Sequence, residues 1–187
     1  MNLFTPSSVS AKLAAVAAVA LGSLALAVPA GAETVAFQDA RGDIDHGADV
    51  RSVRVVNEAA VRVKVRHDDL VRSFRSGSGI KVFLDTDRGQ AGPEFIFLGG
   101  TFEGSDYALI EAEGWKPASR RAEPLECGYI MKLNYADDIA NIKLDRDCIG
   151  NPDEVRVAVR TSGDTGDGFV HDWLGDRREL TRWVARG

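Results

Sequence analysis

The sequence holds few of the residues from which zinc sites are built. Only two cysteines and three histidines occur among its 187 residues. Zinc takes three or four ligands at suitable spacing, and the histidines, His46, His67 and His171, are scattered along the chain. The composition therefore argues against a zinc centre.

An excess of positive charge is also missing. The chain has 23 lysines and arginines against 28 aspartates and glutamates, which gives a net charge of −5. An acidic balance of this kind argues against nucleic acid or an anionic membrane surface as the partner. It favours a soluble protein.

Long apolar runs are absent after residue 32. A transmembrane helix needs about 20 apolar residues. The one candidate lies at the N-terminus, where Lys12 precedes the apolar stretch Leu13–Val28 and Ala30-Gly31-Ala32 forms a small-x-small cleavage site. These are the parts of a secretory signal peptide. We predict that residues 1–32 are removed, that the protein is secreted and that no stable membrane insertion remains, with an uncleaved anchor as the alternative.

The remaining segment, residues 33–187, is long enough to bury a core as one domain. We expect it to be a monomer. Cys127 and Cys148 form an even pair, which in an oxidising compartment predicts a disulfide bond. Two free thiols are the alternative.

Apolar and polar residues alternate through much of this segment. The runs Val61–Arg66 and Val155–Arg160 alternate without interruption, which is typical of antiparallel strands with one face buried. Val53–Val55 is expected to pair with the first run across the short connection Asn57–Ala60. Ile80–Leu84 is apolar nearly throughout and is expected to be a central strand.

Further short strands are expected between clusters of turn residues. One helix of one or two turns is expected over Asp68–Phe74. Short strands at regular spacing predict an all-β fold, an antiparallel β-sandwich of the jelly-roll or immunoglobulin-like type. The additional strands are Glu94–Leu98, Tyr107–Glu111, Tyr129–Leu133 and Ile139–Leu144.

Two loops carry closely spaced carboxylates. Asp39 and Asp43 precede the first hairpin, and Asp85 and Asp87 follow the central strand. Carboxylates at such spacing beside a glycine are suitable ligands for Ca²⁺. The second loop is not an EF-hand, because its twelfth position is Ile96. Alternatively, these aspartates cap turns by accepting bonds from backbone N–H groups.

Catalytic arrangements are hard to find. Ser78 and His67 belong to no nucleophile-elbow pattern, and His67 is expected to be a surface or capping residue. Glycoside hydrolysis uses a pair of carboxylates, and Glu94 is the nearest candidate. An extracellular glycosidic hydrolase is the alternative function.

The aromatic residues include candidates for ligand contact, because rings can stack on the C–H faces of sugars. Trp115 lies in a loop-like stretch between Gly114 and Lys116. We take Trp115 and Tyr107 as the candidate ligand-binding residues. Alternatively, these rings fill the core or cover its edge, as expected for Trp173 and Trp183.

Several short motifs occur in a recognisable order. Together they resemble the β-sandwich superfamily of family-nine carbohydrate-binding modules and DOMON-like domains, over roughly Phe37–Glu111. The composition is also similar to that of secreted proteins of high-GC Gram-positive bacteria that carry such a domain alone. The motifs are Asp39-x-x-Gly42-Asp43, Ala48-Asp49-Val50-x-x-Val53, Val82-Phe83-Leu84-Asp85-Thr86-Asp87 and Gly104-Ser105-Asp106-Tyr107-Ala108-Leu109.

The resemblance implies a sandwich, often with a structural Ca²⁺ and sometimes with a sugar or haem site. Haem-binding relatives use Met and His ligands, whereas Met131 is the one methionine after the signal and lies in a core-like strand. Sugar-binding relatives clamp the sugar between two exposed tryptophans, for which Trp115 is the candidate equivalent. We therefore predict a secreted, non-catalytic binding or structural module. Its expected partner is a cell-wall or extracellular polysaccharide.

Overall fold

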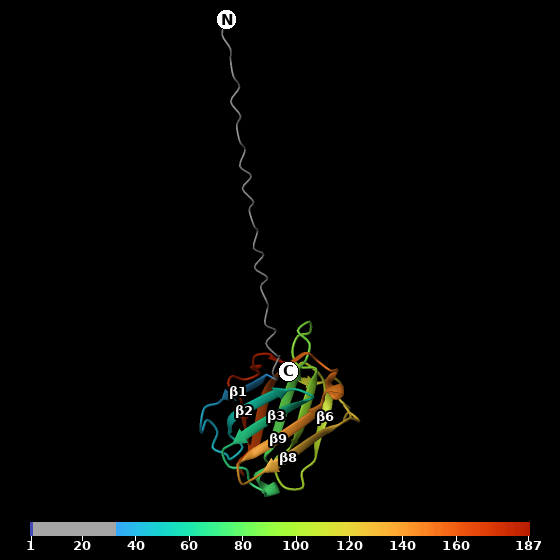
Figure 1. Ribbon diagram of the computed structural model, residues 1–187. Coiled ribbons are helices and arrows are strands. Elements are labelled where there is room, and N and C mark those ends of the chain that lie inside the picture. Colours follow the sequence, from blue (N-terminus) through green and yellow to red (C-terminus); the bar gives the residue numbers. More distant parts are fainter. Residues whose placement is uncertain (2–32) are drawn as a thin grey trace.

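The computed structural model describes Met1 and residues 33–187 (Figure 1). The predicted signal peptide therefore lies outside the described residues, apart from Met1. Two antiparallel sheets pack face to face. The predicted all-β antiparallel sandwich is confirmed.

The first sheet has five strands in the order β1-β2-β3-β9-β8. The expected hairpin is present as β2 and β3, in which Val55 pairs with Val63. Alternation explains why these segments are strands, because every second side chain reaches the core. The bounds are Thr34–Gln38 for β1, Val50–Asn57 for β2, Ala60–His67 for β3, Tyr129–Asn134 for β8 and Ile139–Asp145 for β9.

The second sheet has seven strands, with β12 pairing on β10 beside the order β11-β10-β4-β5-β6-β7. The segment expected to be central is β4, which lies between β10 and β5. The bounds are Gly79–Asp85 for β4, Phe95–Gly100 for β5, Tyr107–Glu113 for β6, Lys116–Pro117 for β7, Glu154–Asp164 for β10, Phe169–Trp173 for β11 and Val184–Ala185 for β12.

The helix predicted over 68–74 is wrong. Only a short 3₁₀ turn, η1 (Phe74–Ser76), forms near it, and a second one, η2 (Arg146–Ile149), follows β9. The N–H groups of Asp68 and Asp69 donate instead to carbonyls of Asp49 and Gly47, so this segment is bonded to a distant loop. No helix within residues 33–187 is long and apolar enough to cross a membrane.

Most buried apolar side chains lie between the two sheets, where valines of β2, β3 and β10 meet Phe97 and Leu109. Burial of one such side chain stabilises the fold by roughly 1.5–3 kcal/mol. A second cluster lies on the outer face of the seven-stranded sheet. It consists of Phe83, Ile96, Ile110 and Ala158, against which Trp115, Ala122, Trp173 and Leu180 pack.

This second cluster explains the nearly unbroken apolar character of β4. Val82 and Leu84 face the inner core, whereas Phe83 belongs to the outer cluster. Both faces of the strand are therefore covered.

The predicted disulfide is confirmed. Cys127 and Cys148 are bonded, with their Cα atoms 5.6 Å apart. The bond links the start of β8 to η2.

Candidate functional site

An aromatic cavity lies on the outer face of the seven-stranded sheet. Phe83 of β4, Trp173 of β11 and Trp115 pack together, with ring centroids 5.2 Å apart for Phe83 and Trp115 and 5.6 Å for Phe83 and Trp173. With Arg160, His171, Arg177 and Arg178, they line a cavity of about 410 Å³, which we call the aromatic cavity.

Positive side chains border this cavity without acidic partners. Arg160 of β10 stands directly opposite Lys81 of β4, and like charges in directly opposed positions destabilise a sheet. Burial and the neighbouring Arg160 lower the pKa of Lys81. Within the described residues, no carboxylate lies within ion-pair distance of Lys81, Arg160, Arg177 or Arg178.

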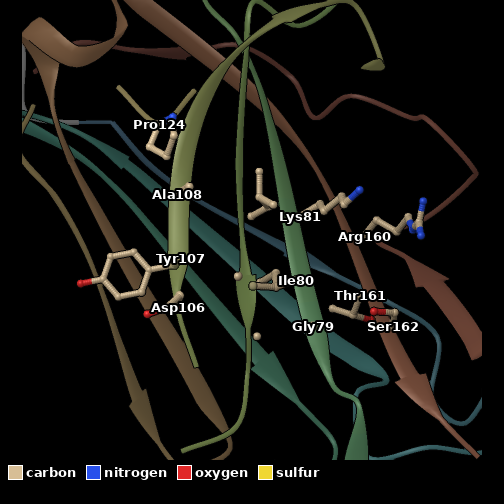
Figure 2. Close-up of a pocket in the computed structure, with 13 residues that line it drawn as sticks. Gly79, Ile80, Lys81, Asp106, Tyr107, Ala108, Pro124, Arg160, Thr161 and Ser162 are labelled. Carbon is tan, nitrogen blue, oxygen red and sulfur yellow. The ribbon is translucent and has the colours of Figure 1, made fainter. Parts of the chain in front are cut away.

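Arg160 also lines a second cavity of about 450 Å³ on strands β10, β4, β5 and β6. Figure 2 shows Lys81 and Arg160 extending on one side of this cavity and Pro124 and Ala108 on the other. The two cavities share Arg160, so a ligand longer than one ring can contact both.

Arg178, which lines the aromatic cavity, has an unusual backbone conformation. Its φ is 64°, in the left-handed region that non-glycine residues seldom adopt. Its guanidinium carbon lies 5.9 Å from the centroid of the Trp115 ring. A strained arginine beside an aromatic ring is a feature that functional sites often retain.

The structure separates the two predicted ligand-binding residues. Trp115 lines the aromatic cavity. The ring of Tyr107 instead packs on Phe97, at 5.8 Å between centroids, and on Tyr129. Tyr107 also lines the second cavity, but in Figure 2 its ring extends away from Lys81 and Arg160.

Sequence reasoning missed most of the cations of this site. Arg160 occupies an outward position of the alternating strand β10. An arginine that only faces solvent would give the same sequence pattern as one that lines a cavity. Arg177 and Arg178 lie in the loop that follows β11. The tryptophan of that strand, Trp173, was expected to cover an edge, and it lines the cavity.

A second group of residues, Asp43, Asp49 and Asp172, forms a carboxylate cluster in which ligand oxygens lie within 4.8 Å of one another. Asp49 and Asp172 are only 1% and 3% exposed. Asp49 precedes β2 of one sheet, and Asp172 lies in β11 of the other. The N–H of Val50 donates to Asp172 Oδ2 at 2.6 Å, so the cluster joins the two sheets.

The negative charges of the cluster are poorly compensated. Burial, followed by Asp43, Asp39 and Asp49, raises the pKa of Asp172 to about 6. Arg51 Nη1 lies 3.3 Å from Asp49 Oδ2, whereas Asp49 Oδ1 is buried without a hydrogen-bond partner. A cation bound among these carboxylates would offset their mutual repulsion.

The predicted calcium ligands fall into two groups. Asp43 belongs to the cluster, and Asp39, whose pKa is raised first by burial, contributes to the raised pKa of Asp172. In the other loop, Asp85 pairs with Arg156 at 2.7 Å, and Asp87 Oδ1 accepts from the Gly89 N–H at 2.8 Å. Asp87 thus caps a turn, the alternative role given above.

Comparisons with known proteins add no assignment. No protein-family model matches the chain, and no match is found among curated proteins.

The other residues considered in the sequence analysis are buried or hydrogen-bonded within the fold. His67 is 2% exposed, and its Nδ1 lies 3.1 Å from the Ala48 carbonyl oxygen, so its expected surface position is wrong. Burial lowers the pKa of His67 to about 4. Ser78 is buried, and Met131 packs in the core between the sheets. Glu94 Oε2 accepts from the N–H and the hydroxyl of Thr86, at 2.6 and 3.1 Å.

Proposed function

We propose that the protein is a secreted, non-catalytic binding module for an acidic carbohydrate, which binds in the aromatic cavity. The observation that carries the proposal is the group of unpaired cations beside Phe83, Trp115 and Trp173. Aromatic faces suit the C–H surface of a sugar ring. A carboxylate or phosphate on that sugar would accept charge-assisted hydrogen bonds from Arg160.

The lining of the aromatic cavity favours binding over hydrolysis. Glycoside hydrolysis uses two carboxylates on either side of the scissile bond. The residues that line the aromatic cavity are aromatic or basic, and none is an aspartate or glutamate. A negatively charged ligand also removes the repulsion between Lys81 and Arg160, which stand in opposed positions.

Titration with oligosaccharides tests this function. An oligogalacturonate should change the tryptophan fluorescence, and Arg160→Gln should weaken its binding about tenfold, the effect of losing one charged hydrogen bond. Arg88→Gln is the matched control, because Arg88 stacks on Trp183 outside the aromatic cavity. A neutral galactan oligomer that binds the unmodified protein as well as the acidic one would contradict the proposal.

A glycosidic hydrolase remains the second candidate, because Glu94 and Glu111 line a separate cavity of about 540 Å³. This activity predicts release of reducing ends from a polysaccharide, abolished by Glu94→Gln. Since Glu94 also accepts hydrogen bonds from Thr86, the melting temperature of this variant must be checked. Turnover that survives in a folded Glu94→Gln protein would exclude Glu94.

We also propose that Ca²⁺ binds the carboxylate cluster and stabilises the sandwich. Ca²⁺ prefers several carboxylate and carbonyl oxygens, and the unpartnered Asp49 Oδ1 is a free ligand atom beside Asp43 and Asp172. A cation there would neutralise carboxylates from both sheets. Secretion would expose the site to millimolar Ca²⁺.

A further inference from the structure

The outer face of the five-stranded sheet carries a group of arginines and lysines on four neighbouring strands. They occupy outward positions of β2, β3, β9 and β8. We call this surface the basic face. Its residues are Arg54, Arg62, Lys64, Arg66, Lys132 and Lys143.

The register of the sheet brings like charges together on this face. Arg54 stands directly opposite Lys64, and Arg62 directly opposite Lys143. Like charges in such positions destabilise a sheet. The arrangement therefore costs stability, which a bound anion would restore.

Acidic residues neutralise only the margin of the basic face. Glu58 pairs with Arg62 at 3.3 Å, and Asp145 pairs with Lys143 at 2.7 Å. In the part of the chain that the structure describes, Arg54, Lys64 and Lys132 have no carboxylate within ion-pair distance.

Solubility alone does not account for this pattern. Any charge keeps an outward strand position soluble, and the whole chain carries more acids than bases, with a net charge of −5. Cations are nevertheless gathered on four strands of one sheet. Segregation of one sign produces a local positive potential that attracts anions in spite of the net charge.

The shape and chemistry of the basic face indicate an extended ligand. A cavity of about 350 Å³ lies over it, with the cations Arg54, Lys64 and Lys132 around apolar side chains such as Val56 and Ile130. Strands lie about 4.8 Å apart, and side chains on one face of a strand about 7 Å apart. Cations at this spacing on neighbouring strands can contact successive anions of an extended chain.

The lining also argues against nucleic acid. Proteins that bind single strands stack bases on aromatic rings, and none of the residues lining this cavity is aromatic. Readout of duplex DNA takes a helix or a two-stranded ribbon that enters the major groove, which the face of a broad sheet does not supply.

We propose that the basic face is a second binding surface, which docks a linear acidic polysaccharide with a carboxylate group in each repeat. The polymer neutralises the opposed pair Arg54–Lys64, since Arg62 and Lys143 already pair with Glu58 and Asp145. This surface lies on the other sheet from the aromatic cavity, so the proposal does not rest on the sugar-binding function.

The test uses polygalacturonate and inorganic polyphosphate as separate probes, with binding measured at several salt concentrations. The double variant Arg54→Gln/Lys64→Gln should weaken binding about tenfold and reduce the salt dependence by about one unit of slope per lost contact. Arg120→Gln/Arg121→Gln removes the same charge from an exposed loop and is the control. The basic-face variant should melt no lower than the unmodified protein, because repulsion is relieved.

Each other outcome overturns the proposal. Equal loss in the two double variants would show binding to net charge only. Loss of polymer binding in Trp115→Ala alone would assign the polymer to the aromatic cavity. Binding of polyphosphate, of anionic phospholipid vesicles or of oligo-dT without binding of polygalacturonate would assign the face to a phosphate polymer, to a membrane or to nucleic acid.

Discussion

The imidazole of His67 is a buried base that the fold keeps neutral. Its pKa is lowered to about 4 by burial, from an ordinary value of 6.5. Between pH 6.5 and about 4, the unfolded chain therefore binds a proton at His67 that the folded chain does not bind. The stability contributed by His67 is complete above pH 6.5 and is lost as the pH falls through about 4.

We expect the free energy of unfolding to decline below pH 6.5 more steeply in the unmodified protein than in His67→Asn. The amide of asparagine does not titrate, and its N–H₂ can still donate to the Ala48 carbonyl. Urea titrations of both proteins between pH 4 and 7 measure the difference. Parallel pH profiles would show that His67 does not titrate with unfolding.

Calcium binding can be tested by a substitution of Asp49, whose Oδ1 is buried without a hydrogen-bond partner. We expect 1 mM Ca²⁺ to raise the melting temperature and a chelator to lower it. Asp49→Asn should lose this response, because a neutral amide oxygen replaces a charged ligand. Asp87→Asn, which changes a turn cap, should retain it. The reverse result would place the ion in the loop that follows β4.

Arg178 allows stability and binding to be separated. Glycine adopts a φ of 64° without strain. Arg178→Gly should therefore raise the free energy of unfolding by up to about 1 kcal/mol, the gain seen when strain is relieved, while weakening the binding of an acidic oligosaccharide. Chemical denaturation and fluorescence titration of the same sample test both effects. Unchanged binding would exclude Arg178 from the site.

At the scale of elements, the disulfide is the strongest single constraint. It ties the start of β8 to η2, across a sequence separation of 21 residues. Closing such a loop is worth about 3 kcal/mol in the chain-entropy model. We expect Cys127→Ser/Cys148→Ser to lose about this much, as measured by urea denaturation. Identical denaturation of the oxidised and reduced proteins would contradict the prediction.

Strands with undisturbed alternation were predictable from the sequence, and β3 and β10 show why. Most of their outward positions are polar and most of their inward positions apolar, with Ala158 as an outward exception, so the period of two is visible. In β11 the inward position belongs to Asp172, whose carboxylate serves the cluster. A polar group in a core position hides the strand. The buried carboxylate thus hid both the strand and its own position from the sequence pattern.

The aromatic cavity could not be predicted for a related reason. Alternation shows that Phe83 and Arg160 face away from the inner core. It does not show that loop residues cover Phe83 on the outer face of the sheet. Trp115 comes from another part of the chain and meets Trp173 only in the folded protein, at 6.0 Å between ring centroids. Such long-range proximity leaves no periodic signal.

For the whole molecule, the net charge does not describe where the charges lie. A value of −5 argued against nucleic acid or an anionic membrane surface as partner, and both outer faces of the sandwich nevertheless carry cations without carboxylate partners. The acids that outnumber them lie elsewhere, and some of them form the carboxylate cluster. Where a charge lies decides more than the sum of charges.

The apolar outer face of the seven-stranded sheet makes the sandwich a three-layered object over part of its area. The third layer is formed by loop residues such as Trp115, Ala122 and Leu180, which pack on the smaller cluster and leave the inner core intact. Local opening of this layer costs less than global unfolding. A ligand in the aromatic cavity should therefore slow amide hydrogen exchange in these loops while the strands of the five-stranded sheet exchange as before.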